Sequence, residues 1–472
     1  MSCKTSIKKT KIICSIGPAS TDPEVMSKMV EAGMNVARIN FSHATMEERA
    51  AVVASVHKVR EMTGKNVAIL YDTKGPEFRN GMMENDEIKL EEGKTIRIVK
   101  EAVLGTSERF SVNHPQAIDN LEVGSIVLLE NGLMKIEVIS VEDDGVTCKI
   151  VNGGVLGNKK SLNAPGVKLD IPFISDVDRE DIIYACQHEG DYIALSFVSC
   201  KEDVLAAREI LKEYHREDMK VISKIESTTG VENLDSIIDV SDGIMVARGD
   251  LGVEVPMQQL PKFQKLMIQR CREKGKFVIV ATEMLESMKK SARPTRAEVS
   301  DVANAVLDGT DAVMLSGETT VGKYPVEVVT YMAQICKDTE EYYDYDYEFE
   351  REVNITETIA NSVVNAASVL GIDLIIASTV SGDTARRISN LKPRCLVLAA
   401  TNSEAVARSL ALNYAVYPTI VPSSDSTDEV IAIAKEKAKE VMGVKEGDII
   451  AITGGFPKNG AKTTNLLKIE QL

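Results

Sequence analysis

Apolar runs typical of β-strands alternate with amphipathic helical patterns over two stretches of the chain, up to residue 75 and again from residue 170 to 340. The first stretch contains TKIICSIG, NVARINFSH and NVAILYDTKG, and the second contains YIALSFVS, VISKIE, GIMVARGD, FVIVATEML and AVMLSGET. Nearly continuous apolar strands followed by amphipathic helices are typical of a parallel sheet covered by helices. Eight such units over about 250 residues predict an α/β fold, a closed (β/α)8 TIM barrel formed by residues 1–75 and 170–340.

The pattern changes between residues 76 and 169, where short alternating segments such as KTIRIVKE and SIVLLENG are separated by the turns EEGK, DDG and NGG. We interpret this region as a β-barrel lid domain inserted after the third strand, placed to close over a site and exclude water. The alternative is that the inserted domain has no role in the site.

Residues 341–472 begin with the acidic, tyrosine-rich segment EEYYDYDYEFERE and then alternate strands with helices again. They predict a C-terminal α/β regulatory domain.

Composition narrows the class of protein. Hydrophobic residues make up 44% of the 472-residue chain, and no apolar run approaches the ~20 residues of a membrane span or the pattern of a signal peptide. We therefore expect a cytoplasmic protein with no membrane association. A net charge of −16 argues against nucleic acid as a partner, although local cations are able to hold an anionic substrate. The eight cysteines lack paired zinc spacing, and Cys14 and Cys148 lie in apolar runs typical of buried, reduced thiols.

Polar and charged residues recur where the predicted barrel strands end. In a TIM barrel these ends form one face, which is where catalytic residues lie. The sequence therefore predicts that seven separate stretches contribute to one pocket. The residues concerned are Asn40, Ser42, Asp72, Thr73, Ser196, Lys224, Glu226, Arg248, Asp250, Thr282, Ser316 and Glu318.

The stretch 220–256 carries the strongest charge pattern. The alternation of a strand places Lys224 and Glu226 on one face, and Asp250 follows the next apolar run, where Gly249 gives the backbone freedom for a tight turn. Two carboxylates beside a lysine indicate a metal-assisted anion site, since Mg²⁺ prefers hard oxygen ligands. A buried structural ion pair is the alternative.

Phosphoryl transfer is one chemistry that such a site supports, because it needs mainly positioning and electrostatic stabilisation. Lys224, an arginine such as Arg38 or Arg79 and a divalent metal are able to supply both. The chain contains no P-loop consensus, so an ordinary nucleotide cradle is absent.

A second anion site is suggested in the C-terminal region by the loop STVSGDTAR, which lies where a strand becomes a helix. The hydroxyl groups and backbone N–H groups of this loop are able to hold a phosphate, and the candidates are Thr379, Ser381, Gly382 and Thr384. A helix cap is the competing interpretation, and Asp383 would repel an anion.

Seven motifs together resemble the pyruvate kinase family along nearly the whole chain: KIICSIGPAS, NVARINFSH, DTKGPE, SKIES, MVARGDLGVEVP, RPTRAEVSDVANAVLDGTDAVMLSGET and GKYPVEVV. The resemblance is to the bacterial type, without the extra terminal domains of some relatives. It implies transfer of a phosphoryl group from phosphoenolpyruvate to ADP, giving ATP and pyruvate, in a homotetramer with a phosphorylated allosteric effector. The alternatives from other classes are a metal-dependent barrel aldolase acting on pyruvate enolate and a non-catalytic metabolite sensor.

The resemblance also implies roles for individual residues. Lys224, Arg38 and Thr282 would be catalytic, and Glu226 and Asp250 would bind Mg²⁺ or Mn²⁺. The potassium ligands would be Asn40, Ser42, Asp72 and Thr73, with Glu77 marking the potassium-dependent form. Gly249 and Asp250, with Thr282, would orient the substrate carboxylate and enolate, and Thr282 would act through water in enolate protonation. The groups near the nucleotide would be Asn40, His43, Arg79 and Lys160, and the effector residues would be Thr379, Ser381, Gly382 and Thr384.

At three places the sequence departs from the family pattern, and these departures limit the residue roles that the resemblance implies. Glu283 stands where the family has Gln, which adds negative charge near the pocket. Glu130 and Asn131 replace a common Asp pair in the lid, which leaves a lid contact to the nucleotide open. Asp383, together with the loop GGFPKNGAKTTN, leaves the identity of the activator open.

Overall fold

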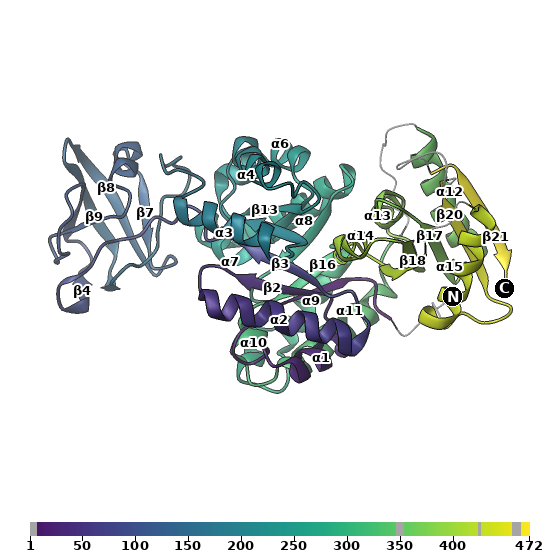
Figure 1. The fold of residues 1–472 in the computed structure, drawn as a ribbon. Coiled ribbons are helices and arrows are strands. Elements are labelled where there is room, and N and C mark those ends of the chain that lie inside the picture. The colour runs from purple at the N-terminus through teal and green to yellow at the C-terminus, as the bar shows by residue number, and fades with distance from the viewer. Residues whose placement is uncertain (1–6, 346–353, 423–425, 456–463) are drawn as a thin grey trace.

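The computed structural model describes residues 7–345, 354–422, 426–455 and 464–472. At its centre, eight parallel strands form a closed barrel in the order β1-β16-β15-β14-β13-β12-β3-β2, which confirms the predicted TIM barrel. Figure 1 shows the barrel between the inserted β domain at one end and the C-terminal domain at the other. The strands are β1 (Lys11–Ser15), β2 (Val36–Asn40), β3 (Ala68–Asp72), β12 (Tyr192–Leu195), β13 (Lys220–Ile225), β14 (Gly243–Ala247), β15 (Phe277–Ala281) and β16 (Ala312–Leu315).

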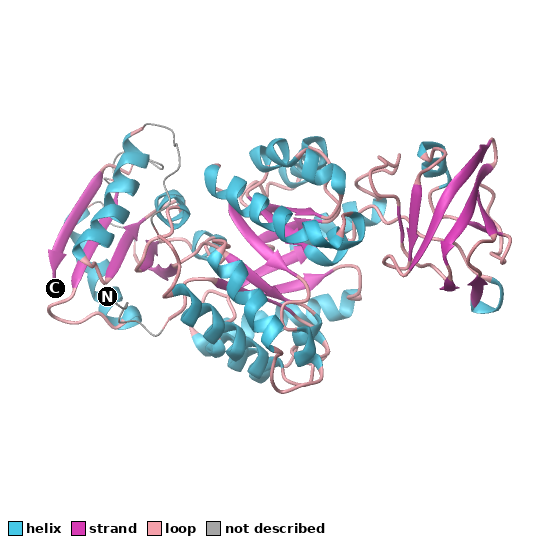
Figure 2. Cartoon of the chain, turned by 180° about the vertical axis from the view of Figure 1, so that it is seen from behind, coloured by secondary structure: helices cyan, strands magenta, loops and turns pink. Residues whose placement is uncertain are grey.

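Helices surround the barrel strands on the outside, as Figure 2 shows. Their starts follow capping chemistry: Thr45 with Glu48, and Thr295 with Glu298, form reciprocal capping boxes. The helices are α1 (Pro23–Ala32), α2 (Met46–Thr63), α3 (Asp176–Gln187), α4 (Lys201–Glu213), α5 (Thr228–Glu232), α6 (Leu234–Val240), α7 (Arg248–Glu254), α8 (Leu260–Glu273), α9 (Arg296–Leu307), α10 (Gly317–Thr320) and α11 (Pro325–Glu340), with short 3-10 turns η3 (Met257–Gln259) and η4 (Glu286–Lys289).

The inserted domain between β3 and α3 is built from β-strands with their own apolar core. One sheet has six strands in the order β11-β7-β8-β9-β5-β6, and β10 pairs with β4. The structure thus has the predicted inserted β domain, in the form of two sheets. The elements are η1 (Glu84–Asp86), β4 (Glu87–Leu90), β5 (Thr95–Val99), β6 (Arg109–Ser111), η2 (Pro115–Asn120), β7 (Ile126–Leu129), β8 (Met134–Glu142), β9 (Gly145–Asn152), β10 (Gly154–Gly157) and β11 (Leu162–Asn163).

The C-terminal domain is a five-stranded sheet in the order β19-β18-β17-β20-β21, with β21 antiparallel at one edge. Its elements are α12 (Ile355–Leu370), β17 (Leu374–Ser378), α13 (Asp383–Asn390), β18 (Leu396–Thr401), α14 (Glu404–Ser409), β19 (Val416–Ile420), α15 (Thr427–Met442), β20 (Ile449–Gly454) and β21 (Leu466–Gln471). The last seven residues of the acidic segment 340–352 lie outside the described residues, as does most of the loop GGFPKNGAKTTN.

The C-terminal domain closes the amino end of the barrel. Ala411 and Leu412 join the core cluster formed by inward-facing barrel residues such as Tyr192. The Arg408 Nε donates to Asp191 Oδ1 at 2.9 Å across the same boundary. The opposite, carboxyl end of the barrel is therefore the end that faces the inserted domain.

The structure corrects one local expectation. The glycine at 249 was expected to give a tight turn after the strand, but helix α7 begins at Arg248, directly after β14. The N–H of Gly249 donates to Thr282 Oγ1 at 2.8 Å, and an added Cβ would be in ordinary van der Waals contact with that oxygen, at 3.5 Å. Among the helices of the described ranges, none has both the length and the apolarity that crossing a membrane requires.

Candidate active site at the carboxyl ends of the barrel strands

Lys224 is the centre of the charged cluster at the barrel mouth. It lies near the end of β13, and its Nζ donates to Ser196 Oγ at 2.6 Å and to Asp72 Oδ1 at 3.0 Å. Glu226 Oε1 forms an ion pair with the same Nζ at 3.2 Å. Burial opposes the charge on Lys224, but Asp72 and Glu226 outweigh that effect and raise the pKa of the ammonium group. Lys224 is therefore a fixed cation at neutral pH.

Asp72 links Lys224 to Arg38 on the neighbouring strand. Arg38 Nε donates to Asp72 Oδ2 at 2.7 Å, and Arg38 Nη1 donates to Ser15 Oγ at 2.7 Å. Burial alone would raise the pKa of Asp72, but Arg38 and Lys224 hold it below its ordinary value. Two cations thus share one buried carboxylate, which holds both of them in place at the barrel mouth.

Glu226 and Asp250 supply the carboxylates predicted to bind a metal. Glu226 is only 1% exposed, and its Oε2 accepts from the N–H of Phe197 at 2.6 Å. Burial raises the pKa of Glu226 to about 7, Lys224 opposes that shift, and Asp250 adds to it. A buried carboxylate next to a second negative charge fits a divalent cation well. The described part of the chain has no cluster of three or more acidic, His or Cys ligands, so a metal here would keep positions open for water or substrate.

Thr282 follows β15 in a left-handed conformation, with φ of 71°. Its carbonyl accepts from Arg248 Nη2 at 2.7 Å, and Arg248 also pairs with Asp301 Oδ2 at 2.7 Å. Arg248 therefore buttresses the loop from the side of α9. The strained backbone places the Thr282 hydroxyl against the N-terminus of α7, where it accepts from Gly249. Glu283 is exposed.

The four residues assigned to potassium lie on two adjacent strand ends, and Asn40 is the register partner of Asp72. Asn40 Oδ1 accepts from the N–H of Ser42 at 3.0 Å. Thr73 Oγ1 accepts from the N–H of Ser196 at 3.2 Å. The oxygens of these side chains are hard donors, and those of Asn40, Asp72 and Thr73 accept hydrogen bonds from within the chain.

Candidate nucleotide contacts extend from the barrel mouth into the inserted domain. Arg79 forms a two-point contact with Glu77, at 2.6 and 2.9 Å, and Lys160 Nζ lies 2.6 Å from Glu130 Oε1. His43 is exposed. Burial would raise the pKa of Glu77, but hydrogen bonds from Arg79 and Lys74 hold it below its ordinary value. The cations expected near a nucleotide thus have internal counter-ions here.

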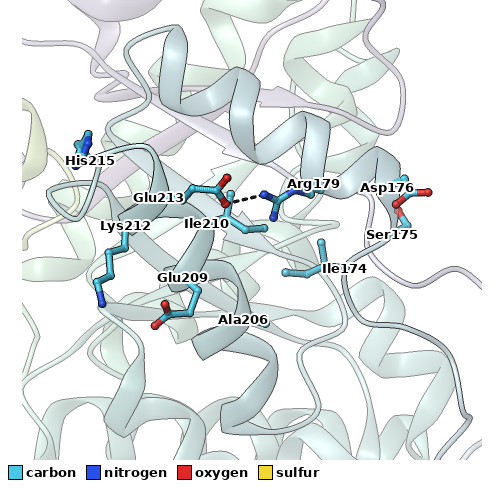
Figure 3. A pocket seen from close by; sticks show the side chains of 10 residues that line it. All are labelled: Ile174, Ser175, Asp176, Arg179, Ala206, Glu209, Ile210, Lys212, Glu213 and His215. Atoms are coloured by element: carbon cyan, nitrogen blue, oxygen red, sulfur yellow. Dashed lines mark hydrogen bonds and ion pairs between the residues drawn. The ribbon is translucent and has the colours of Figure 1, made fainter.

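Two hydrogen bonds tie both connections of the inserted domain to helix α3. Asp178 Oδ1 accepts from the N–H of Gly75 at 2.9 Å, on the outgoing connection. Asp178 Oδ2 accepts from Ser175 Oγ at 2.6 Å, on the returning connection. A pocket of about 930 Å³ lies along these two connections and includes Arg79. A separate pocket of about 690 Å³, between α3 and α4 on the outside of the barrel, contains none of the predicted site residues (Figure 3).

The effector candidates lie at the start of α13. The Gly382 N–H donates to Thr379 Oγ1 at 2.9 Å, and Gly382 has a φ of 83°. Thr384 Oγ1 lies 2.6 Å from Thr464 Oγ1. Arg386 Nη1 donates to the carbonyl of Ser381 at 2.9 Å. The loop is therefore closed by hydrogen bonds within the C-terminal domain.

The negative charge of Asp383, which was expected to oppose an anion, is partly offset by a neighbour. Arg387 Nε pairs with Asp383 Oδ2 at 2.8 Å, and Arg387 also pairs with Glu357.

Sequence reasoning missed several supporting residues. Ser15 holds Arg38, Asp301 holds Arg248, and Asp178 joins the two connections of the inserted domain. The only sequence signal among them was the S-x-x-D capping pattern at Ser175, which marks a helix start and not a hinge. Glu318 was counted among the strand-end residues, but its buried carboxylate accepts from the backbone N–H groups of Ser316 and Leu285 and so has a local structural role.

The fold and the site together define a class: a TIM-barrel phosphotransferase with an inserted domain above its catalytic face. Comparison with known families makes this specific. The family described as "Pyruvate kinase, barrel domain" matches residues 7–329, and "Pyruvate kinase, alpha/beta domain" matches residues 357–470. The chain belongs to the pyruvate kinase family.

Individual relatives agree with this assignment over nearly full length. The chain is 45% identical to a pyruvate kinase of Geobacillus stearothermophilus over 469 residues, covering 98% of this chain and 80% of that protein. It is 42% identical to one of Clostridium acetobutylicum, covering 98% and 99%. The crystal structure of a pyruvate kinase from Cryptosporidium parvum superposes with a TM-score of 0.94 at 40% identity, covering 98% and 96%. The aldolase alternative is set aside.

Proposed function

We propose that the protein transfers the phosphoryl group of phosphoenolpyruvate to ADP, giving ATP and pyruvate as the last step of glycolysis. The observation that carries the proposal is the Arg38–Asp72–Lys224–Glu226 cluster at the barrel mouth, with distances of 2.7, 3.0 and 3.2 Å along the series. Two fixed cations beside two buried carboxylates suit a reaction in which a highly charged group moves between two anions.

Arg38 and Lys224 would bind the phosphoryl oxygens. Both cations are held by Asp72, so little reorganisation is needed when the substrate arrives. Fixed charges aimed at a transferring group stabilise the transition state more than mobile ones do. We assign Lys224 to the moving phosphoryl group and Arg38 to its oxygens in the ground state.

The opposite side of the pocket would hold the rest of the substrate. The start of α7, with Gly249 and Asp250, would orient the carboxylate and the enolate, and the Thr282 hydroxyl lies against Gly249. Thr282 would act through a water molecule in protonation of the enolate. Its left-handed backbone conformation fixes the hydroxyl, which supports a positioning task.

Glu226 and Asp250 would hold Mg²⁺ or Mn²⁺. When bound, the metal supplies Lewis-acid stabilisation of the enolate and phosphoryl oxygens. Asn40, Ser42, Asp72 and Thr73 would supply oxygen ligands for K⁺. Glu77 is the residue of the potassium-dependent form. Its contact with Arg79 supports a role close to the proposed K⁺ site.

Asn40, His43, Arg79 and Lys160 would contact ADP. Arg79 and Lys160 are paired with Glu77 and Glu130, so nucleotide phosphates would have to replace these carboxylates. Residues 76–169 would then act as a lid over the barrel formed by residues 1–75 and 170–340, hinged at Asp178.

Residues 341–472 would regulate activity by binding a phosphorylated effector at Thr379, Ser381, Gly382 and Thr384. The Arg387 contact to Asp383 supports this, because it reduces the repulsion of a phosphate. We further propose a cytoplasmic homotetramer.

The direct test measures pyruvate and ATP formed from phosphoenolpyruvate and ADP with Mg²⁺, with and without K⁺. We expect activity that depends on both cations. Absence of ATP under every condition would contradict the reaction. Equal rates without K⁺ would contradict the potassium requirement, and with it the roles given to Glu77 and to the four potassium ligands. Titration with sugar phosphates and AMP would identify the activator.

A further inference from the structure

Ser196 lies directly after β12, is 2% exposed, and touches three groups of the site. Its hydroxyl oxygen is 2.6 Å from Lys224 Nζ, 3.3 Å from Asp72 Oδ1 and 2.7 Å from the carbonyl oxygen of Thr73. The shortest of the three contacts is the one to Lys224.

The single hydrogen of a hydroxyl group determines how Ser196 is able to act. Lys224 is an ammonium donor with no acceptor capacity, so Ser196 has to accept from it. The hydroxyl hydrogen is then directed to the Thr73 carbonyl, the nearer of the two remaining acceptors. The backbone of Thr73 therefore orients a lone pair of Ser196 toward Lys224.

The ammonium group of Lys224 donates hydrogen bonds to Asp72 and Ser196 and forms an ion pair with Glu226. Glu226 is also a carboxylate assigned to the metal, and Asp72 is shared with Arg38. Ser196 is the remaining, neutral acceptor, and it has no competing cation among its contacts. It sets the direction of the lysine without reducing its charge.

We propose that Ser196 is a positioning residue for phosphoryl transfer, which anchors Lys224 so that its charge is aimed at the moving phosphoryl group. The proposal rests on the proposed function. It concerns the direction of the Lys224 side chain and gives Ser196 no contact with the substrate.

The same serine joins Lys224 to the connection that leads into the inserted domain. The N–H of Ser196 donates to Thr73 Oγ1 at 3.2 Å. An added Cβ at Gly75, which has a φ of 73°, would lie 2.8 Å from Ser196 Cβ. The outgoing connection thus packs directly on Ser196, and only glycine fits there. A movement of this connection would be transmitted to the anchor of Lys224.

The test compares Ser196→Ala with Ser196→Cys in the phosphoenolpyruvate and ADP assay. Alanine removes the acceptor, and cysteine replaces the hydroxyl with a somewhat larger thiol, which is only a weak acceptor. We expect kcat to fall about 10- to 100-fold in both variants, with KM for phosphoenolpyruvate changed less than about threefold, since the interaction acts mainly in the transition state.

A matched control is Ser223→Ala on β13, a buried serine whose Oγ lies 2.7 Å from Ser241 Oγ. It loses a buried serine hydrogen bond to Ser241 instead of one to Lys224, so its kcat should stay at the wild-type value while its unfolding temperature falls. A thermal unfolding scan of each variant separates lost activity from lost folding.

A double variant distinguishes action through Lys224 from a general effect. If Ser196 acts by aiming Lys224, Ser196→Ala should cost less than about twofold when added to Lys224→Met. A full additional loss there, a wild-type kcat in Ser196→Cys, or a wild-type kcat in Ser196→Ala would each overturn the proposal. An inactive wild-type protein would instead overturn the proposed function, and a fully active Lys224→Met would overturn the role that it assigns to Lys224.

Discussion

The role of Lys224 makes the most direct prediction about the chemistry. Substitution Lys224→Met keeps the length and apolar stem of the side chain but removes a cation that is 12% exposed. At about 4 Å from a phosphoryl oxygen and an effective dielectric constant of about 20, one charge contributes about 4 kcal/mol. Since about 1.4 kcal/mol corresponds to a factor of ten in rate, kcat should fall roughly a thousandfold.

The assay measures pyruvate formation at saturating phosphoenolpyruvate, ADP, Mg²⁺ and K⁺. Metal affinity is measured separately by titration with Mn²⁺, and it should change little because Glu226 and Asp250 remain. The matched control is Lys220→Met at the other end of β13, whose Nζ lies 3.8 Å from Asp242 Oδ1. A kcat within tenfold of the wild type in Lys224→Met, with the control unchanged, would refute the assigned role.

Three further outcomes follow from the same contacts. Burial, reinforced by Asp250, raises the pKa of Glu226 to about 7, so protons compete with the metal at neutral pH. The apparent Mg²⁺ affinity should therefore fall by up to about tenfold per pH unit below the pKa. A calorimetric titration that gives the same Mg²⁺ affinity at about pH 5.5 and 7 would contradict this. Asp178→Ala removes acceptors from Gly75 and Ser175, so it should destabilise the hinge by about 1–3 kcal/mol and increase hydrogen exchange there, and unchanged protection would exclude the hinge role. Glu283→Gln should change kcat/KM less than about threefold because the side chain is exposed to solvent, which screens its charge, and a larger gain would show that this carboxylate opposes the anionic substrate.

Hydrophobic periodicity was sufficient for the barrel because a buried parallel strand and its covering helix each leave a distinct pattern. The same periodicity placed Lys224 and Glu226 on one face, and the structure has them 3.2 Å apart. Positions beyond the strands were less predictable. Arg248 was counted with the strand-end residues, but it lies at the first position of α7 and pairs with Asp301 on another helix.

In the effector loop, too, the residue types could be predicted from the sequence, but their contacts could not. Its hydroxyl and glycine residues were recognisable from their types, but the partner of Asp383 depends on the turn of α13 that brings Arg387 next to it. Thr384 contacts Thr464, which is 80 residues away in the chain, and no local sequence pattern predicts that contact.

The sequence by itself determined the eight-unit barrel, the inserted β domain, and the set of polar residues that collect at one end, because each depends on residue type and short-range spacing. Tertiary structure alone decided which of those residues touch. Lys224 meets Asp72 across 152 residues of chain, and Ser196 meets both through the order in which barrel strands lie side by side. Hydrogen bonds depend on distance and direction at the scale of an ångström, and those are properties of the closed barrel rather than of any one strand.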